Sequence, residues 1–475
     1  MPPETFEKII TDKGVKNIVD KITKIGDLAA PPICFPDIHM KPSMETPTSM
    51  AVATNSTIIP TLITSTVGCG MGLIATNLTK DDITVEFCKS FSTDLMSGFS
   101  HEKKSRIRTF LTWAGLYTEK KKAPYDLSLV ELQDVIEHGA HAVVEKYGFT
   151  LSVLNHIEKG GNIMDDEACV QTRESHIIPR SGRIGSLHNL GYWPGGNHFI
   201  EIQYIETIQN HDVARSWGLH EGQVVIMYHG GEGSLGFYVG RYFSRRKKHG
   251  LRERLLRFPA KFLFHFLSLD GLIRTVRRWK YYFIFRPLQE IPLHSREGER
   301  LMTSLKASMN YGYASRLAIV ARIRDALSKT LSQKNITTQL VWDSTHNAIT
   351  EETVQKRPCL IHRNGTVTVE PGRPVIISGT NTTQSYLGCG EVGAEYYLYS
   401  ADHGVGVSHE KKVRGGEVTE HGGRHTTYLY HVSSGSEKIL PHTSSDALDE
   451  VTKTLEKHGI VSPVARMRPL AAFKA

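Results

Sequence analysis

One cysteine with glycine on both sides could bind a metal ion. Cys69 lies between Gly68 and Gly70, just after an apolar run at residues 58–63. Glycine at both positions allows the backbone to turn sharply and leaves room for a large group beside the sulfur. Cys69 is therefore a candidate metal ligand. The same pattern also suits a small apolar residue in a turn at the end of a strand, so both interpretations stay open at this point.

Histidines occur in five further clusters, each beside glycine or at the end of an apolar run. The clusters are Pro-Asp-Ile-His at 36–39, Gly-Gly-Asn-His-Phe-Ile-Glu at 195–201, His-Gly-Gly-Glu-Gly-Ser-Leu-Gly at 229–236, Ser-Thr-His-Asn at 344–347 and Asp-His-Gly-Val-Gly at 402–406. A lone histidine of this kind is usually structural, but a cysteine and several histidines at long separations are typical of one site assembled from many strand ends. Their donor atoms suit zinc, manganese, iron or cobalt. The cluster at 229–236 lacks a Gly-Lys-Ser/Thr ending, which excludes a Walker A phosphate loop.

The spacing of apolar residues predicts the elements that must position these clusters. Alternating or short apolar runs predict strands at 199–205, 222–228, 340–342, 359–362 and 374–377. Helical spacing predicts helices at 127–147, 301–331 and 446–458. The length of 475 residues permits two or three ordinary domains or one large α/β domain.

The composition is that of a folded protein from a reducing compartment. Hydrophobic residues make up 40% of the chain and charged residues 22%, which is enough apolar material for a sizeable core. The six cysteines show no Cys-x-x-Cys spacing, which argues against a disulfide scaffold or a zinc knuckle. The first residues lack the apolar segment of a signal peptide. We therefore expect a cytoplasmic protein without stable membrane association.

Residues 241–293 form a basic and aromatic segment. Between Arg241 and Glu290, fourteen Lys and Arg residues face only three acids, a local charge of +11 that exceeds the +8 of the whole chain. This excess favours a polyanionic partner. Three interpretations of the segment compete: an amphipathic helical pair packed on the body, an RNA-contacting arm that uses charge and stacking, and a helix on a membrane surface. The segment is too charged to cross a bilayer.

The order of these motifs resembles the RtcB family of RNA ligases over about residues 31–474. The most specific matches are Gly-Asn-His-Phe-Ile-Glu at 196–201, Val-Ala-Arg-Met-Arg-Pro at 464–469 and the penultimate Lys474. The resemblance implies a single large mixed α/β domain over 1–475, with a central metal and nucleotide site. It also implies a ligase that uses GTP and Mn²⁺. Such an enzyme joins an RNA 3′-phosphate or 2′,3′-cyclic phosphate to a 5′-hydroxyl through a guanylylated histidine, in tRNA splicing or RNA repair.

The resemblance also assigns roles to individual residues and partners. His403 corresponds to the guanylylated histidine, and a neutral imidazole suits this role because it can attack phosphorus without first losing a proton. Cys69 corresponds to a thiolate shared by two metal ions, with His198 on one side and both His229 and His346 on the other. The implied nucleotide site consists of Asn197, His198, Phe199, Ile200, Glu201, His346, Asn347, Ser378, Gly379, Thr380, Asn381, Ser385, Gly404, Val405, Gly406 and Lys474. The implied partners are RNA, as tRNA halves or broken RNA, and an archease-like activator known for some members of the family.

Three departures from the family pattern bear on activity. The family has a metal-binding aspartate three residues before the cysteine, where this chain has Thr66, and a hydroxyl is a poor substitute because it brings no charge. We therefore expect the ion shared by Cys69 and His198 to be weakened or absent. Val407 stands where the family usually has an arginine that faces phosphate. In the loop after His229, Glu232-Gly233-Ser234 replaces the family's Ser-Arg-Gly, so a second such arginine is lost and an acid is gained. These changes keep two alternatives open: a catalytically weakened paralogue that binds RNA or nucleotide, and a metal-dependent phosphoesterase.

Overall fold

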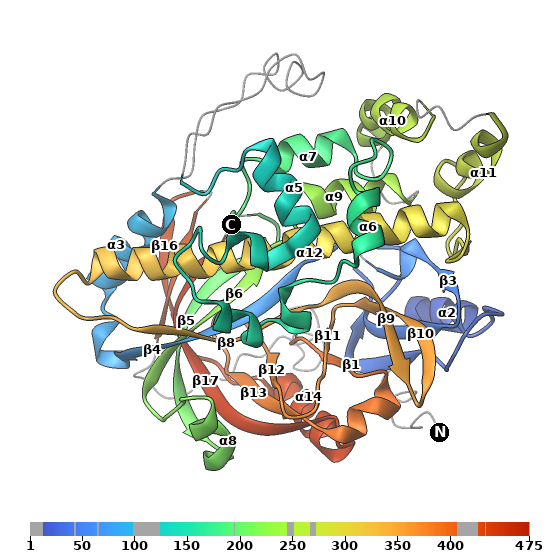
Figure 1. Cartoon of the computed structure of the whole chain (residues 1–475). Helices are drawn as coiled ribbons and strands as arrows, with labels where there is room; N and C mark the ends of the chain where they lie inside the picture. The colour runs from blue at the N-terminus through green and yellow to red at the C-terminus, as the bar shows by residue number, and fades with distance from the viewer. Residues whose placement is uncertain are drawn as a thin grey trace.

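A large mixed sheet forms the centre of the molecule in this computed structural model (Figure 1). The structure describes residues 13–41, 44–63, 66–97, 124–193, 195–244, 251–266, 272–405, 426–432 and 434–474. In spatial order the sheet contains β12 (Pro374–Ile377), β13 (Ser385–Gly390), β17 (Val461–Lys474), β5 (Phe199–Ile208), β6 (Gln223–Gly230), β4 (Gly70–Thr79) and β8 (Thr338–Thr345), and neighbours in this order are antiparallel. On one side β15 (Thr426–His431) pairs in parallel with β17, and β16 (Ser436–Pro441) pairs with β15.

One long helix, α12 (Arg296–Thr330), runs across the molecule and packs on β4, β6 and β8 (Figure 1). Ser295 caps its N-terminus by accepting a hydrogen bond from the Gly298 N–H. Most of its residues are buried, because other helices cover the sides that do not face the sheet. These are α3 (Val85–Met96), α5 (Leu129–His138) and α9 (Gly233–Tyr242). Further helices are α2 (Lys13–Ile22), α6 (Asp166–Gln171), α7 (Arg180–Ser186), α8 (His211–Ser216) and α14 (Asp446–Lys457).

A second antiparallel sheet contains the strand that follows the histidine cluster at 344–347. Its order is β1 (Ile33–His39), β2 (Thr48–Thr54), β10 (Arg357–Asn364) and β9 (Asn347–Val354). Two short pairs are β3 (Thr57–Ile58) with β7 (Ile291–Pro292), and β11 (Thr366–Thr368) with β14 (Ser400–Asp402). Apolar side chains of β1, β2 and β10 pack with those of α14 into a core of their own. The chain thus alternates between two sheets, and the connections between them carry several of the candidate site residues.

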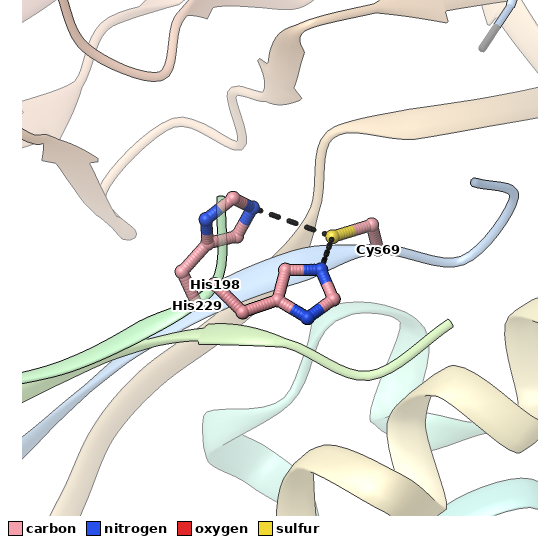
Figure 2. Close-up of side chains that lie close together, drawn as sticks. All are labelled: Cys69, His198 and His229. Atoms are coloured by element: carbon pink, nitrogen blue, oxygen red, sulfur yellow. Dashed lines mark hydrogen bonds between the residues drawn. The ribbon is translucent and has the colours of Figure 1, made fainter. Parts of the chain in front are cut away.

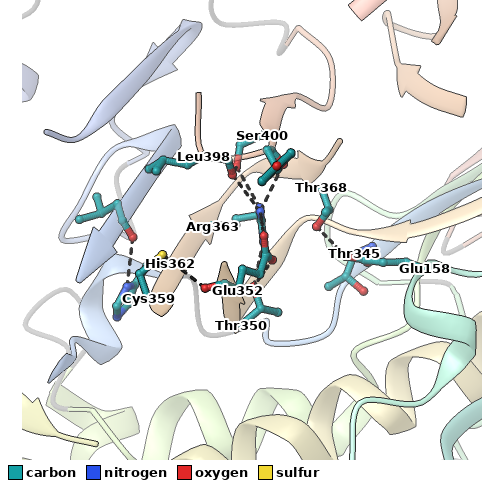
Figure 3. Close-up of polar contacts among 12 residues, drawn as sticks. Glu158, Thr345, Thr350, Glu352, Cys359, His362, Arg363, Thr368, Leu398 and Ser400 are labelled. Atoms are coloured by element: carbon teal, nitrogen blue, oxygen red, sulfur yellow. Dashed lines mark hydrogen bonds and ion pairs between the residues drawn. The ribbon is translucent and has the colours of Figure 1, made fainter. Parts of the chain in front are cut away.

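Arg363 on β10 is a buried structural charge (Figure 3). Its guanidinium lies 2.5 and 2.9 Å from the two carboxylate oxygens of Glu352, and it donates to Ser400 Oγ at 2.9 Å and to the Leu398 carbonyl at 3.0 Å. Because these acceptors come from β9, β14 and the turn before β14, one side chain ties three segments together. The fixed partners compensate for the loss of water around the charge.

The neighbouring His362 points to the opposite side of β10 and is expected to make stability depend on pH. Its Nδ1–H donates to the Val52 carbonyl at 3.2 Å, and its Nε2 accepts the Ile59 N–H at 3.0 Å. Burial lowers the pKa of His362 to about 4. Between pH ~6.5 and ~4 the unfolded chain binds a proton that the native chain excludes, so stability is complete above this window and falls by about 3 kcal/mol as pH drops through it.

The check is the thermal midpoint measured from pH 7 to pH 4.5 for the chain and for His362→Gln, both stripped of metal. The variant is less stable at pH 7 because it loses native hydrogen bonds, but its midpoint falls less steeply with acid. Equal slopes in the two proteins would show that His362 does not contribute to the acid sensitivity.

The basic segment contains two helices packed against the start of α12, α10 (Leu251–Phe266) and α11 (Leu272–Tyr282). Figure 1 shows them beyond that end of the long helix. Arg278 pairs with the buried Glu297, which also accepts from Tyr282 at 3.0 Å and from Arg300 at 3.0 Å. Of the three interpretations of this segment, these contacts favour the helical pair packed on the body.

The elements predicted from periodicity are largely confirmed. The strands at 199–205 and 222–228 lie in β5 and β6, and the long helix and the last helix are α12 and α14. The single helix predicted at 127–147 is wrong. Gly139 takes a φ of 60° and ends α5, after which the chain continues as a 3₁₀ turn at Gly139–Val143. Within the described part of the chain, none of the helices combines the length and apolar character needed to cross a bilayer.

Candidate metal and nucleotide site

Strand register brings the sequence clusters to one end of the central sheet. Phe199 at the start of β5 lies opposite His229 on β6 and opposite Lys474 on β17. On the next strand, Gly70 of β4 lies opposite Gly230 of β6 on one side and Thr345 of β8 on the other. Residues from five segments far apart in the sequence therefore meet at this edge.

The Cys69 thiol lies between two buried histidines (Figure 2). Its Sγ is 3.5 Å from His198 Nε2 and 3.3 Å from His229 Nε2. All three ligand atoms lie within 4.8 Å of one another, which is compact enough for one ion to contact each of them. Burial raises the pKa of the Cys69 thiol, and the nearby Glu232 carboxylate raises it further.

Backbone carbonyls fix which nitrogen of each histidine faces the cysteine. His198 Nδ1 is 3.1 Å from the Trp193 carbonyl, and His229 Nδ1 is 3.3 Å from the Asn197 carbonyl. A carbonyl only accepts hydrogen bonds, so both Nδ1 atoms carry the hydrogen. In the neutral ring each Nε2 then presents a lone pair toward Cys69, which is the tautomer a metal ligand needs. The chemistry of this donor set therefore fits a divalent metal ion.

His346 and His403 extend the cluster. His346 Nε2 is 3.3 Å from His229 Nε2, and the His346 N–H donates to the Cys69 carbonyl at 3.0 Å. The His403 ring stacks on His346, with centroids 4.6 Å apart and planes 24° apart. Burial and then the positive charge of Lys41 lower the pKa of His403 to about 4, so the ring is neutral at pH 7.

The glycines around Cys69 are required by packing, which corrects the reason inferred from sequence. Gly68 has a φ of 84°, and a Cβ there would lie 2.6 Å from the Ser308 carbonyl oxygen of α12. A Cβ on Gly70 would lie 2.3 Å from the Ser344 carbonyl oxygen. The two glycines thus let the Cys69 loop fit between α12 and β8. The space beside them is occupied by the Ser308 and Ser344 carbonyl groups and is not open to a ligand.

Arg316 of α12 holds the Cys69 loop in place through hydrogen bonds. No motif in the sequence predicts this role. Its Nε lies 2.9 Å from both carboxylate oxygens of Asp343, its Nη1 donates to the Gly68 carbonyl at 2.6 Å, and its Nη2 donates to Thr345 Oγ1 at 3.1 Å. Tyr228 also donates to Asp343 at 2.7 Å. One guanidinium therefore fixes the residues that precede both Cys69 and His346. The only signal in the sequence was an arginine inside an apolar helix.

A second polar cluster lies where β5 meets β13 and β17. Gln203 donates to Glu201 at 2.5 Å and to Ser385 Oγ at 3.1 Å, and Ser385 Oγ also accepts the Gly379 N–H at 3.0 Å. Burial raises the pKa of Glu201 to about 7. Lys474 donates to Asn381 Oδ1 at 3.1 Å, and the pKa of this half-buried lysine is lowered by burial.

The loop between β12 and β13 joins this cluster to His403. The Ser378 N–H donates to the His403 carbonyl, and the Val405 N–H donates to the Ser378 carbonyl, both at 3.0 Å. Gly404 has a φ of 146°, and a Cβ there would lie 2.3 Å from the Ser378 carbonyl oxygen. Within the same loop, Thr380 N–H donates to Thr383 Oγ1 at 2.7 Å. The backbone of Ser378 is therefore bonded directly to the segment that carries His403.

The side chains of two predicted nucleotide-site residues lie in apolar clusters and not among these contacts. Ile200 lies on the face of β5 opposite Phe199 and Glu201, with its side chain in the apolar core. Val405 is also part of a buried apolar cluster. Gly406 lies outside the described residues, as does Val407. The side chains of Ile200 and Val405 are thus not placed to contact a ligand, and the Val405 N–H is already bonded to the Ser378 carbonyl.

Two of the positions that depart from the family pattern, Thr66 and Glu232, contact other candidate site residues. Thr66 accepts a hydrogen bond from Asn347 Nδ2 at 3.2 Å, and Asn347 Oδ1 accepts the Gly365 N–H at 3.1 Å. Glu232, the acid gained in the loop after His229, lies beside Cys69 and His198. Its carboxylate Oε2 lies 3.0 Å from His198 Nε2, and the carboxylate also contacts the Cys69 thiol.

A family model described as tRNA-splicing ligase RtcB matches residues 19–475. The chain belongs to the RtcB family. This confirms the resemblance drawn from the motifs, and it confirms the mixed α/β fold that the resemblance implied. The RtcB family is one of RNA ligases, so the cluster of Cys69, His198 and His229 lies in a protein of ligase ancestry.

Archaeal RtcB proteins are similar to this chain over most of its length. The relative from Thermococcus kodakarensis is 27% identical over 442 residues, which cover 86% of this chain and 80% of the relative. Those from Pyrococcus furiosus and Pyrococcus horikoshii are 27% and 25% identical, over 86% and 99% of this chain but only 40% and 50% of their own lengths. Each is named tRNA-splicing ligase RtcB. Because the chain spans half or less of the two Pyrococcus proteins, its own substrates and partners are treated below as proposals.

Proposed function

We propose that this protein is a GTP- and Mn²⁺-dependent RNA ligase that works through a guanylylated His403. It would join RNA ends bearing a 3′-phosphate or 2′,3′-cyclic phosphate to 5′-hydroxyl ends, in tRNA splicing or RNA repair. The observation that carries the proposal is the stacking of His403 on His346. His346 Nε2 in turn lies 3.3 Å from His229 Nε2, and His229 Nε2 lies 3.3 Å from Cys69 Sγ. A nucleophile and a set of metal ligands thus lie side by side in an RtcB-family fold.

The protonation state of His403 supports its role in the proposed first step, the transfer of GMP from GTP to the imidazole. A neutral imidazole is the nucleophile, and the low pKa of His403 keeps it neutral at pH 7. Cys69, His198, His229 and His346 would hold Mn²⁺, which when bound neutralises phosphate charge and orients the departing pyrophosphate. The positive charge of Lys41, close enough to lower the pKa of His403, adds attraction for phosphate.

The cluster at β5 and β17 supports a guanine base as the other part of the substrate. Guanine presents a carbonyl acceptor and N–H donors, whereas adenine lacks the carbonyl. Lys474 offers a donor and Glu201 an acceptor, and Asn381 can serve as either. Burial around Glu201 strengthens such hydrogen bonds because water is excluded. The loop at 378–380 joins this cluster to His403, so base and phosphate subsites would be continuous.

RNA is the proposed partner, and the basic segment at 241–293 is one surface that could attract it. Its exposed aromatic side chains, Phe258 and Trp279, lie next to basic residues. We also propose that residues 1–475 act as one ligase domain, because α12 contacts elements from both halves of the chain. An archease-like activator is a further proposed partner.

The test of this function is end-specific RNA joining. One RNA strand with a 3′-phosphate and another with a 5′-hydroxyl are incubated with the protein, GTP and Mn²⁺. We expect a joined product that requires GTP and does not form from strands with a 3′-hydroxyl and a 5′-phosphate. RNA binding without joining, across Mn²⁺, Co²⁺ and Zn²⁺, would instead support the weakened paralogue. Release of phosphate from the RNA end without joining would support the phosphoesterase.

A further inference from the structure

Glu232 occupies a position that neither the family resemblance nor the comparisons assign to it. It lies between the end of β6 and the start of α9, at the N-terminal boundary of the helix. Gly231 has a φ of 113°, and a Cβ there would lie 2.7 Å from Arg316 Cγ. Gly233 has a φ of 52°, and a Cβ there would lie 2.5 Å from the Tyr311 ring. The two glycines press the loop against α12, and the side chain between them turns inward.

The Glu232 carboxylate faces the His198 imidazole and the Cys69 sulfur, two groups that can bind a metal ion. It is 12% exposed, its Oε2 lies 3.0 Å from His198 Nε2, and the carboxylate also contacts the Cys69 thiol. In the neutral His198 ring, the Trp193 carbonyl 3.1 Å from Nδ1 places the hydrogen on Nδ1, so that Nε2 presents its lone pair toward Glu232. A carboxylate oxygen, an imidazole lone pair and the Cys69 sulfur therefore converge in a buried space. Such groups repel one another unless a proton or a metal cation lies between them.

We propose that Glu232 is a metal ligand, which binds the same divalent ion as Cys69 and His198. The inference rests on the metal-dependent function proposed above. Thiolate, imidazole and carboxylate together are a donor set found for Zn²⁺ and Mn²⁺, and the carboxylate supplies the negative charge that Thr66 does not. The Thr66 hydroxyl, in contrast, is hydrogen bonded to Asn347. This assignment reverses the expectation that the ion between Cys69 and His198 is weakened or absent.

The competing explanation is an ion pair without metal. In that case His198 is a protonated imidazolium that donates to Glu232. The two explanations differ in what removal of the Glu232 charge does. If Glu232 is a ligand, the loss weakens metal binding, whereas an ion-pair partner of His198 would compete with the metal, and its loss would leave affinity unchanged or improve it.

The experiment measures metal binding by the full chain without GTP or RNA. The protein is stripped with a chelator and titrated with Co²⁺, followed by the thiolate-to-cobalt absorption, and with Mn²⁺, followed by the magnetic resonance signal of the free ion. We expect Glu232→Gln to bind at least about tenfold more weakly. The matched control is Glu174→Gln, which removes another carboxylate 3.2 Å from a histidine nitrogen, that of His176, away from the site. It should bind like the wild type.

An unchanged or higher affinity of Glu232→Gln would overturn the proposal. So that the result does not depend on the folding of the variant, the wild-type chain loaded with Co²⁺ or Mn²⁺ is also located by anomalous X-ray diffraction. A Glu232 oxygen at about 2.0–2.2 Å from the ion is expected, and a bound ion without this contact would refute the assignment. Neither measurement uses GTP or RNA. Failure of the joining assay with a positive metal result would therefore reject only the ligase function, and the reverse combination would reject only the role of Glu232.

Discussion

His403→Ala is expected to abolish the covalent GMP adduct and to lower RNA joining by about 10⁴-fold or more, because the variant lacks the nucleophile that begins the reaction. Burial and the charge of Lys41 keep the native ring neutral, with a pKa of about 4. The His346 ring stacked on it cannot replace it, since its Nε2 is directed at His229. The adduct is measured by intact-protein mass spectrometry after incubation with GTP and Mn²⁺.

The control for this variant is His220→Ala, which removes an exposed histidine near β6. It should form the adduct at the wild-type level. The His403→Ala protein should also bind Mn²⁺ with nearly unchanged affinity, because the substitution removes none of the proposed Mn²⁺ ligands. An adduct that persists in His403→Ala would place the nucleophile on another residue and would contradict the proposed mechanism.

Arg316→Met is expected to lower the free energy of unfolding by about 3–5 kcal/mol, because it leaves the buried Asp343 carboxylate without its countercharge. The side chains of both residues are almost completely buried, at 0% and 2% exposure. The variant also removes the hydrogen bonds to the Gly68 carbonyl and to Thr345. We therefore expect weaker Mn²⁺ binding together with the lower stability. The measurements are the thermal midpoint of the metal-free protein and a Mn²⁺ titration.

The matched control is Arg324→Met on the same helix. Its guanidinium is 31% exposed and pairs with the adjacent, solvent-exposed Asp325. Such a pair contributes about 1 kcal/mol or less, and the hydrogen bond from Arg324 to the Tyr147 carbonyl contributes about 1 kcal/mol. The midpoint should therefore fall much less than in Arg316→Met, and the metal affinity should stay close to the wild-type value. Equal midpoints for Arg316→Met and Arg324→Met would mean that the buried pair with Asp343 does not hold the Cys69 loop in place.

Local patterns in the sequence were sufficient for much of the fold. The strands at 199–205 and 222–228 and the helix at 301–331 were predictable because each has apolar residues at the period of its own backbone geometry. The same information failed at Gly139, where a positive φ ends α5 although apolar residues continue beyond it. A periodic pattern reports which face is buried, but not where a backbone must change direction.

The sequence by itself was also sufficient to identify the family and to select Cys69, His198 and His229 as candidate metal ligands. Cys69, His198 and His229 were predicted as one cluster, and the structure places them within 4.8 Å of one another. Their residue types fix the chemistry, because few other side chains bind a transition metal in this way. The motifs around them are long enough to identify the RtcB family before any contact is known.

Only the tertiary structure decided what surrounds those groups. Arg316 reaches Gly68 across 248 residues of sequence, and the carboxylate of Glu232 lies beside His198, which precedes it by two strands and a helix. Such contacts depend on how α12 packs against the strand ends, and no local pattern encodes that packing. The charge beside a metal site affects its affinity, and in the sequence only Thr66 bears on the proposed ion at Cys69 and His198. The folded protein adds the Glu232 carboxylate beside His198, on which the proposal above rests.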